Sequence, residues 1–162
     1  MTQVERYEKV FLLLGGGLLI ACLFALFYAS FGMGIHLPGR GGEVDPMVVH
    51  STAPFNNPGV RRVSPDEYEV VLVGQIWAFL PRELRVPVGA TIRFVATSPD
   101  VIHGFQIEGT RVNMMLIPGQ ISTMSYRFRE PGKHRILCHE YCGAGHHTMF
   151  GTVIVENAEG EG

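Results

Sequence analysis

Candidate metal ligands crowd into one segment of the chain, Cys138-His139-Glu140-Tyr141-Cys142-Gly143-Ala144-Gly145-His146-His147-Thr148-Met149. Two thiols, several imidazoles and a thioether fall within this segment. A further imidazole, His103, ends the upstream stretch Ser98-Pro99-Asp100-Val101-Ile102-His103. Sulfur ligands combined with imidazole favour copper(I), zinc or iron over a hard cation such as magnesium. The segment therefore predicts a site for a soft or borderline metal.

Short runs rich in β-branched residues surround this segment and are separated by turn signals. In one of them Ile92, Phe94 and Ala96 fall on a common face, as in a half-buried strand. No run after Pro38 has the period of a helix. Evenly spaced short strands predict an all-β sandwich or barrel. The expected strands are residues 69–73, 83–86, 91–97, 119–128, 132–138 and 150–156.

The candidate ligands lie where these strands end. The cysteine-rich segment fills the connection between the last two strands, and His103 lies in the loop after Thr91–Thr97. A rigid sandwich that presents ligands on its end loops can hold a metal site in fixed geometry. We therefore expect the two loops to form one site.

The N-terminal part is of a different kind, with no charged side chain from Val10 to Ile35. About 20 apolar residues suffice to cross a bilayer, so residues 1–36 are expected to hold one transmembrane helix at about 10–35. A buried core helix would show a polar face, and a cleavable signal peptide would have a shorter apolar run. Cys22 resembles the lipidated residue of a lipoprotein, but the run stays uncharged well beyond it.

Charge sets the expected orientation and excludes one class of partner. Arg6 and Lys9 precede the apolar run and Arg40 follows it, which places the N-terminus in the cytoplasm and the β domain outside. The whole chain carries 13 basic and 15 acidic side chains, so nothing indicates nucleic-acid binding.

Between the expected helix and the β domain the sequence reads as a connection. Turn-forming clusters occur at Pro38-Gly39-Arg40-Gly41-Gly42 and at Asn56-Asn57-Pro58-Gly59. We therefore expect a linker over 37–65, a β domain over 66–157 and a C-terminal tail over 158–162.

Several sites are compatible with the cysteine-rich segment. Cys138 and Cys142 could form a disulfide in an oxidising compartment, which leaves the nearby imidazoles and thioether unexplained. A zinc site would take two Cys and two His and leave Met149 without a role. A mononuclear blue-copper site needs one Cys only, with a weak axial Met. Two thiolates bridging two copper ions, each ion with one His, is the interpretation that uses every residue.

The segment Cys138–Met149 resembles the binuclear copper (CuA) motif of cytochrome c oxidase subunit II, C-x-E/Q-x-C-G-x-x-H-x-x-M. The resemblance extends from Ser98–Phe105 to Gly151-Thr152-Val153. It implies a cupredoxin-like Greek-key barrel that binds two copper ions. The implied ligands are His103, Cys138, Cys142, His146, Met149 and the backbone oxygen of Glu140.

The chain is short and has one expected membrane helix, and in both respects it is most similar to subunit II of ba-type (B-family) haem-copper oxidases. This implies a bacterial or archaeal cell membrane, with the copper domain on the periplasmic or extracellular side. Electrons would come from cytochrome c and pass to haem in subunit I, where oxygen is reduced to water with proton pumping. Membrane lipid and a small third subunit are further implied partners. In Tyr7-Glu8-Lys9, Glu8 matches a residue at the entrance of a proton path.

The resemblance also implies an aromatic patch at Trp77-Ala78-Phe79 through which Trp77 and Phe79 receive electrons, although a single Trp in a sandwich is most often a core residue. His139 and His147 adjoin ligands but are not themselves expected to be ligands. Two alternatives stay open. The copper subunit of a nitric oxide reductase can carry the same motif, and a membrane-anchored copper-binding or assembly protein would bind metal without relaying electrons.

Overall fold

A computed structural model describes residues 3–33 and 39–157. The chain consists of two compact units, residues 1–37 and 38–162. In the first unit α1 (Gln3–Phe27) continues as the π-helix η1 (Tyr28–Gly32). This helix is long and apolar enough to cross a membrane, with a mean hydropathy of 2.7 in its most apolar window. It begins before the expected residue 10 because the polar N-terminal turns contain no helix breaker. Residues 34 and 35 of the expected helix lie outside the described residues.

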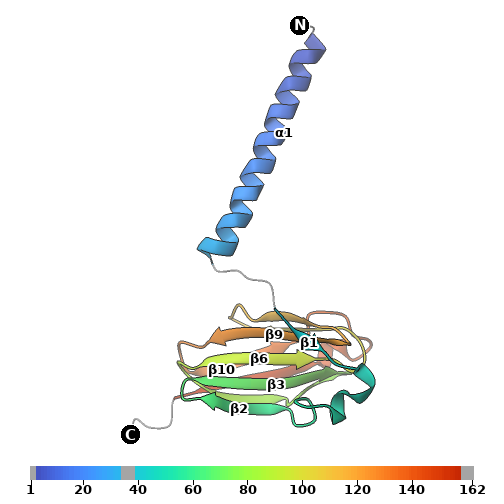
Figure 1. The fold of residues 1–162 in the computed structure, drawn as a ribbon, viewed down its shortest axis with the longest axis vertical. Coiled ribbons are helices and arrows are strands. Elements are labelled where there is room, and N and C mark those ends of the chain that lie inside the picture. The colour runs from blue at the N-terminus through green and yellow to red at the C-terminus, as the bar shows by residue number, and fades with distance from the viewer. Residues whose placement is uncertain (1–2, 34–38, 158–162) are drawn as a thin grey trace. The chain divides into compact units, whose positions relative to one another are not determined.

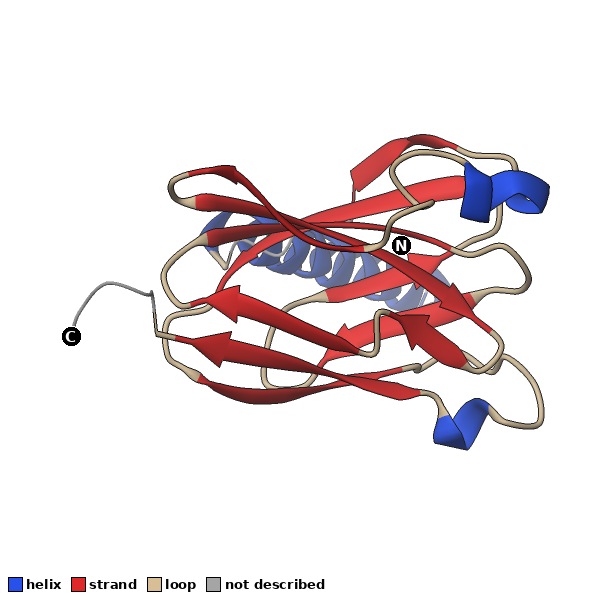
Figure 2. Ribbon diagram, turned by 90° about the horizontal axis from the view of Figure 1, so that it is seen from below, coloured by secondary structure: helices blue, strands red, loops and turns tan. Residues whose placement is uncertain are grey.

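The second unit is built of two β-sheets that face each other (Figures 1 and 2). One sheet has the strand order β1-β9-β6-β3-β2, with β4 paired to β3, and the other has the order β5-β11-β10-β7-β8. The pairs β3–β6 and β5–β11 are parallel and the remaining pairs are antiparallel. Parallel neighbours cannot be joined by a hairpin, so the chain crosses between the sheets. The elements are β1 (Gly39–Glu43), η2 (Pro46–Ser51), β2 (Gly59–Ser64), β3 (Glu67–Gln75), β4 (Ala78–Leu80), β5 (Glu83–Pro87), β6 (Thr91–Thr97), β7 (His103–Ile107), β8 (Asn113–Leu116), β9 (Gln120–Arg127), β10 (Gly132–Leu137), η3 (His146–Thr148) and β11 (Phe150–Glu156).

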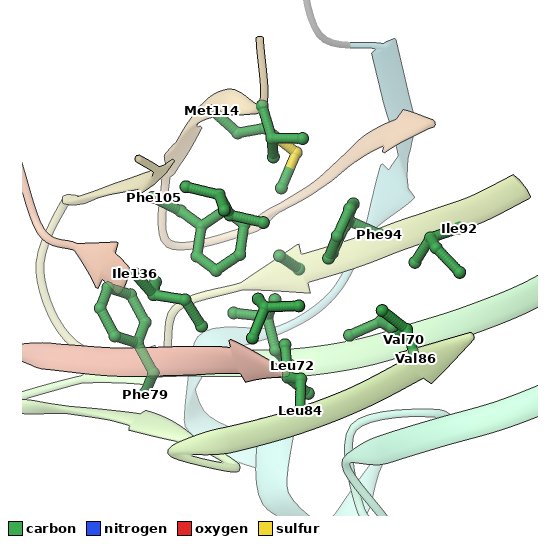
Figure 3. Packing of buried hydrophobic residues seen from close by; sticks show 14 of the residues in the cluster. Val70, Leu72, Phe79, Leu84, Val86, Ile92, Phe94, Phe105, Met114 and Ile136 are labelled. Atoms are coloured by element: carbon green, nitrogen blue, oxygen red, sulfur yellow. The ribbon is translucent and has the colours of Figure 1, made fainter. Parts of the chain in front are cut away.

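Apolar side chains from both sheets fill the space between them (Figure 3). Phe105 is at the centre and contacts Phe79 edge-on, with ring centroids 5.6 Å apart, and Phe94 at 5.8 Å. Ile92 and Phe94 point into this core as the alternation of β6 predicts. The core is continuous with the expected metal site, because Cys138, Cys142 and Met149 belong to the same buried cluster. Three of the expected ligands are thus part of the main core of the domain.

The expected linker over 37–65 is wrong for most of its described part. Residues 39–64 contribute the edge strands β1 and β2 of the first sheet, and the segment between them, with η2, covers the outer face of that sheet. Val49 and Phe55 are buried there in a second apolar cluster with Val71 and Val73 of β3. The cluster Asn56-Asn57-Pro58-Gly59 lies at a turn as expected, whereas the described part of Pro38–Gly42 is wrong as a turn, because it forms strand β1. The isolated apolar side chains between the two clusters, which carry no period, hold the segment on the sheet.

Shorter strands were also outside the sequence prediction. β4, β7 and β8 have three to five residues each, too few for a periodic pattern to stand out. In consequence His103, expected in a loop, is the first residue of β7.

Candidate metal centre

The expected ligands meet at one end of the β domain. His103 begins β7, and the segment 138–149 connects the end of β10 to the start of β11, where Leu137 pairs with Phe150. The turn between β3 and β4 reaches the same end, since the backbone N–H of Ile76 bonds to a side chain of the loop before His103. Three connections from both sheets therefore surround the site.

Each of the six expected donors lies within 4.0 Å of a cysteine sulfur. The Sγ atoms of Cys138 and Cys142 are 3.8 Å apart. Nδ1 of His103 is 4.0 Å from the Cys138 sulfur, and Nδ1 of His146 is 3.5 Å from the Cys142 sulfur. The remaining two donors also lie one beside each thiol. Met149 Sδ is 3.7 Å from Cys142 Sγ, and the Glu140 carbonyl oxygen is 3.2 Å from Cys138 Sγ. Each thiol thus has one imidazole and one weaker donor beside it.

The two thiols are free and buried. Their separation is far longer than the roughly 2 Å of a disulfide bond. Burial raises the pKa of the Cys142 thiol from 9.0 to about 11, and the hydrogen bond with Cys138 adds to this effect. Without a bound cation, Cys142 is therefore protonated at neutral pH.

Asp100 holds His103 in place. Its Oδ1 is 2.9 Å from His103 Nε2 and also accepts from the Ser98 hydroxyl, while its Oδ2 accepts from the backbone N–H of Ile76 at 2.7 Å. Burial acts to raise the pKa of the Asp100 carboxyl, but the bonds from His103, Ile76, Val101 and Ser98 outweigh it and hold the pKa below its ordinary value of 3.8. An ionised Asp100 keeps the proton of His103 on Nε2 and leaves Nδ1, which faces Cys138, free to bind a metal.

Trp77 lies against the segment 138–149. Its Nε1–H donates to the Cys142 carbonyl oxygen at 3.2 Å. A Cβ atom added at Gly145 would lie 2.3 Å from the indole, and one added at Gly143 would lie 3.3 Å from Nε1. The two glycines therefore form a flat seat for the ring. Trp77 as a whole is 39% exposed, so it contacts both the segment 138–149 and solvent.

Two other aromatic side chains border the ligands. His139 is exposed and its ring covers Gly104, where an added Cβ would lie 2.6 Å from the imidazole. Tyr141 is 75% exposed, and its ring centroid lies 5.9 Å from that of His146. His147 is also exposed. None of these three side chains belongs to the group of donors described above.

Two further expected residues lie away from this group. Phe79 is fully buried in the core, so it offers no surface to an electron donor. Any part that Phe79 takes in electron transfer is behind Trp77. Glu8 is an exposed residue of α1, in the other unit of the chain.

The donor set fits copper better than the alternatives. Two thiols, two imidazoles, a thioether and a carbonyl lie together, and His103 is fully buried with the Cys138 sulfur 4.0 Å from its Nδ1. Zinc sites draw on Cys, His and carboxylates and do not need a thioether. Soft sulfur ligands with imidazole are characteristic of copper. The donors are paired, with one imidazole beside each thiol.

Sequence reasoning missed the residues that support the ligands. Asp100 stood in the quoted stretch before His103, and a carboxylate three residues from a candidate histidine ligand is a usable signal, because metal-binding histidines commonly donate their other N–H to a carboxylate. The contact of Ile76 with Asp100 and the position of His139 over Gly104 have no such signal. They depend on the register that brings distant loops together.

Comparison with known proteins places this geometry in a family. Residues 76–158 match the model of the cytochrome c oxidase subunit II periplasmic domain. Cytochrome c oxidase subunit 2 of Thermus thermophilus is 39% identical over 157 residues, 94% of each chain, and a second sequence of that name from the same organism is 42% identical over 130 residues, 79% of this chain and 96% of its own length.

Solved structures agree with this assignment. A subunit in the cryo-EM structure of a haem-copper terminal oxidase dimer superposes with a TM-score of 0.76 at 35% identity, covering 93% of this chain and 99% of its own. The periplasmic domain of subunit II of cytochrome oxidase (CoxB) of Bradyrhizobium japonicum has the same fold, with a TM-score of 0.51 at 24% identity over 55% of this chain and 83% of its own. The expected architecture, one apolar N-terminal helix followed by a cupredoxin-like β domain, is confirmed. By its sequence, its fold and the residues gathered at its metal centre, the chain belongs to the cytochrome c oxidase subunit II family.

Proposed function

We propose that this chain is the copper-bearing, electron-accepting subunit of a membrane-bound haem-copper oxidase. The observation that carries the proposal is the pairing of donors, with one imidazole and one weaker donor beside each of two thiols. When bound, two copper ions held by these donors would supply a centre that takes up and releases one electron with little rearrangement. The ligands are His103, Cys138, Cys142, His146, Met149 and the Glu140 carbonyl oxygen.

The protein surface around these ligands suits a soluble electron donor such as cytochrome c. Large apolar side chains surround the centre and are partly exposed: Ile76, Trp77, Val101, Ile102 and Tyr141, here called the apolar rim. Trp77 is the member through which we propose that electrons enter, because its N–H bonds directly to the carbonyl of a ligand residue. Subunit I then receives the electron at its haem and reduces oxygen to water, coupled to proton pumping.

The helical unit supports a membrane location. The helix over Gln3–Gly32 serves as a single-pass anchor in contact with membrane lipid. The N-terminus is in the cytoplasm and the metal centre is on the periplasmic or extracellular side. Arg6 and Lys9 before the apolar run favour this orientation. Glu8 lies in the first turns of the helix, where it could receive protons for subunit I.

Metal content combined with an electron paramagnetic resonance spectrum of the full chain in detergent tests the proposal. We expect two copper ions per chain and a seven-line hyperfine pattern, which arises when two copper nuclei share one unpaired electron. One copper with a four-line pattern, or zinc alone, would contradict it. Cys142→Ser should abolish the seven-line pattern, whereas Met149→Leu should retain copper and change the reduction potential.

A further inference from the structure

The turn between β3 and β4 contributes no ligand, yet it contacts both loops that do. The backbone N–H of Ile76 donates to Asp100 Oδ2 at 2.7 Å, and Asp100 in turn contacts His103. The next residue, Trp77, donates from its indole to the Cys142 carbonyl at 3.2 Å. Two adjacent residues therefore reach the loop of His103 on one side and the loop of the cysteines on the other.

This turn is well anchored. Gln75 pairs with Ala78, so Ile76 and Trp77 form the two-residue connection of a hairpin. Before the turn, β3 is buried from Val70 to Gly74, and after it Phe79 is fully buried and packs edge-on against Phe105. Phe105 belongs to the same strand as His103. The turn is therefore held at both ends by strands whose side chains pack in the core.

The segment 138–149 has less support of its own. Outside the short helix η3 it lacks regular structure, and Tyr141, His147 and Thr148 are exposed. The indole of Trp77 lies against it over Gly143 and Gly145. Gly145 has φ −90°, an ordinary value for any residue, so the absence of a side chain there serves the contact with Trp77 and not the backbone.

We infer that the Ile76–Trp77 turn is a bracket that fixes the spacing of the two ligand loops before copper binds. Trp77 is then a positioning residue for the metal centre, separately from any part in electron transfer. The inference is tested by two measurements, and only the second, copper release, rests on the proposed function. The first, the position of the indole on the loop, is made on the metal-free protein. A preformed site loses less conformational entropy on binding and so retains its metal longer.

Three variants of the full chain in detergent test the bracket. Trp77→Phe removes the Nε1–H but keeps a ring, and Gly145→Ala drives the indole from its seat without straining the backbone. Ile102→Ala is the matched control, because it truncates an exposed side chain of the same apolar rim. Trp77 is the only tryptophan of the chain, so fluorescence excited at a wavelength that the five tyrosines do not absorb reports on this ring alone.

In the metal-free protein, Gly145→Ala should shift the tryptophan emission to longer wavelength, while Ile102→Ala should not. After loading with copper, Trp77→Phe should release the metal to a chelator about fivefold faster than the wild type, the effect of one net hydrogen bond. Gly145→Ala should release it at least as fast as Trp77→Phe, and Ile102→Ala within about twofold of the wild type on the same scale.

The inference would be overturned if all three variants released copper at the wild-type rate while the emission of Gly145→Ala was shifted. The indole would then have moved without effect on the site. An unshifted emission in Gly145→Ala would also overturn it, since the indole would not be seated on the loop. A failure of the proposed function is distinguishable: the wild-type chain would lack two copper ions, whatever the emission of the metal-free variants.

Discussion

At the scale of single residues, the charge of Asp100 is expected to set the reduction potential of the metal centre. Its carboxylate lies 2.9 Å from His103 Nε2 and is held ionised by four hydrogen-bond donors. In Asp100→Asn the negative charge is lost, so the oxidised, more positive state is less stabilised. We expect the midpoint potential, measured by redox titration of the copper absorption, to rise by tens of millivolts as an order of magnitude.

Ser98→Ala is the control for this charge effect. It removes a hydroxyl that bonds to Asp100 Oδ1 but keeps the carboxylate. Its potential should remain much closer to the wild type than that of Asp100→Asn. A lower potential in Asp100→Asn, or equal shifts in both variants, would show that geometry and not charge controls the centre.

The thiol of Cys142 makes copper loading depend on pH. Its pKa in the metal-free protein is about 11, so the group is protonated at every pH below that value, and copper must displace the proton to bind the thiolate. The apparent affinity should therefore rise with pH, roughly tenfold per unit for each proton released. Proton release on adding copper in a weakly buffered solution measures this directly. In Cys142→Ser the released proton should be missing, and a wild-type affinity independent of pH from 6 to 8 (roughly the neutral range) would contradict the prediction.

At the scale of elements, the segment between β1 and β2 should behave as part of the domain. Phe55 is 1% exposed and packs in the cluster that covers the outer face of β3. Phe55→Ala should lower the free energy of unfolding by about 3–5 kcal/mol, the usual cost of a large cavity in a core. Met47→Ala, in the same segment but 88% exposed, should leave it nearly unchanged. Equal stabilities of the two variants by denaturant unfolding would mean that the segment is a detachable linker.

Elements differed in how far the sequence could predict them, and length explains only part of the difference, since the six-residue β2 was missed and the five-residue β5 was expected. The strands β6, β9, β10 and β11 have six to eight residues, and the expected runs overlap all of them. β4 and β8 have three and four residues, too short to repeat a pattern. Phe55 and Val49 are single apolar residues among turn formers, and only the neighbouring sheet shows that they are buried. In the metal centre, local spacing predicts the ligands but not Ile76 or Gly104, whose partners are distant in sequence.

At the scale of the whole molecule, the chain combines a strongly apolar anchor with a nearly neutral domain. Residues 1–35 hold two acidic and two basic side chains, so the remaining 127 residues hold 13 acidic and 11 basic ones, a net charge of −2. A larger negative charge would attract a basic cytochrome from a distance. With so small a net charge, short-range contact must contribute more to the encounter with a donor.

The salt dependence of electron transfer tests this balance. The apolar rim, Ile76, Trp77, Val101, Ile102 and Tyr141, offers contacts that salt does not screen. We therefore expect the second-order rate constant for reduction by a soluble cytochrome c to fall by no more than about threefold between 10 mM and 200 mM salt (roughly 30 Å to under 10 Å of screening length), in stopped-flow measurements. Ile102→Ala should slow the reaction at every ionic strength by reducing apolar contact, and Glu140→Gln, which removes an exposed charge beside the rim, should change it little. A steep fall with salt that Glu140→Gln relieves would instead make charge the dominant attraction, because only a charged contact is weakened by screening and by neutralisation alike.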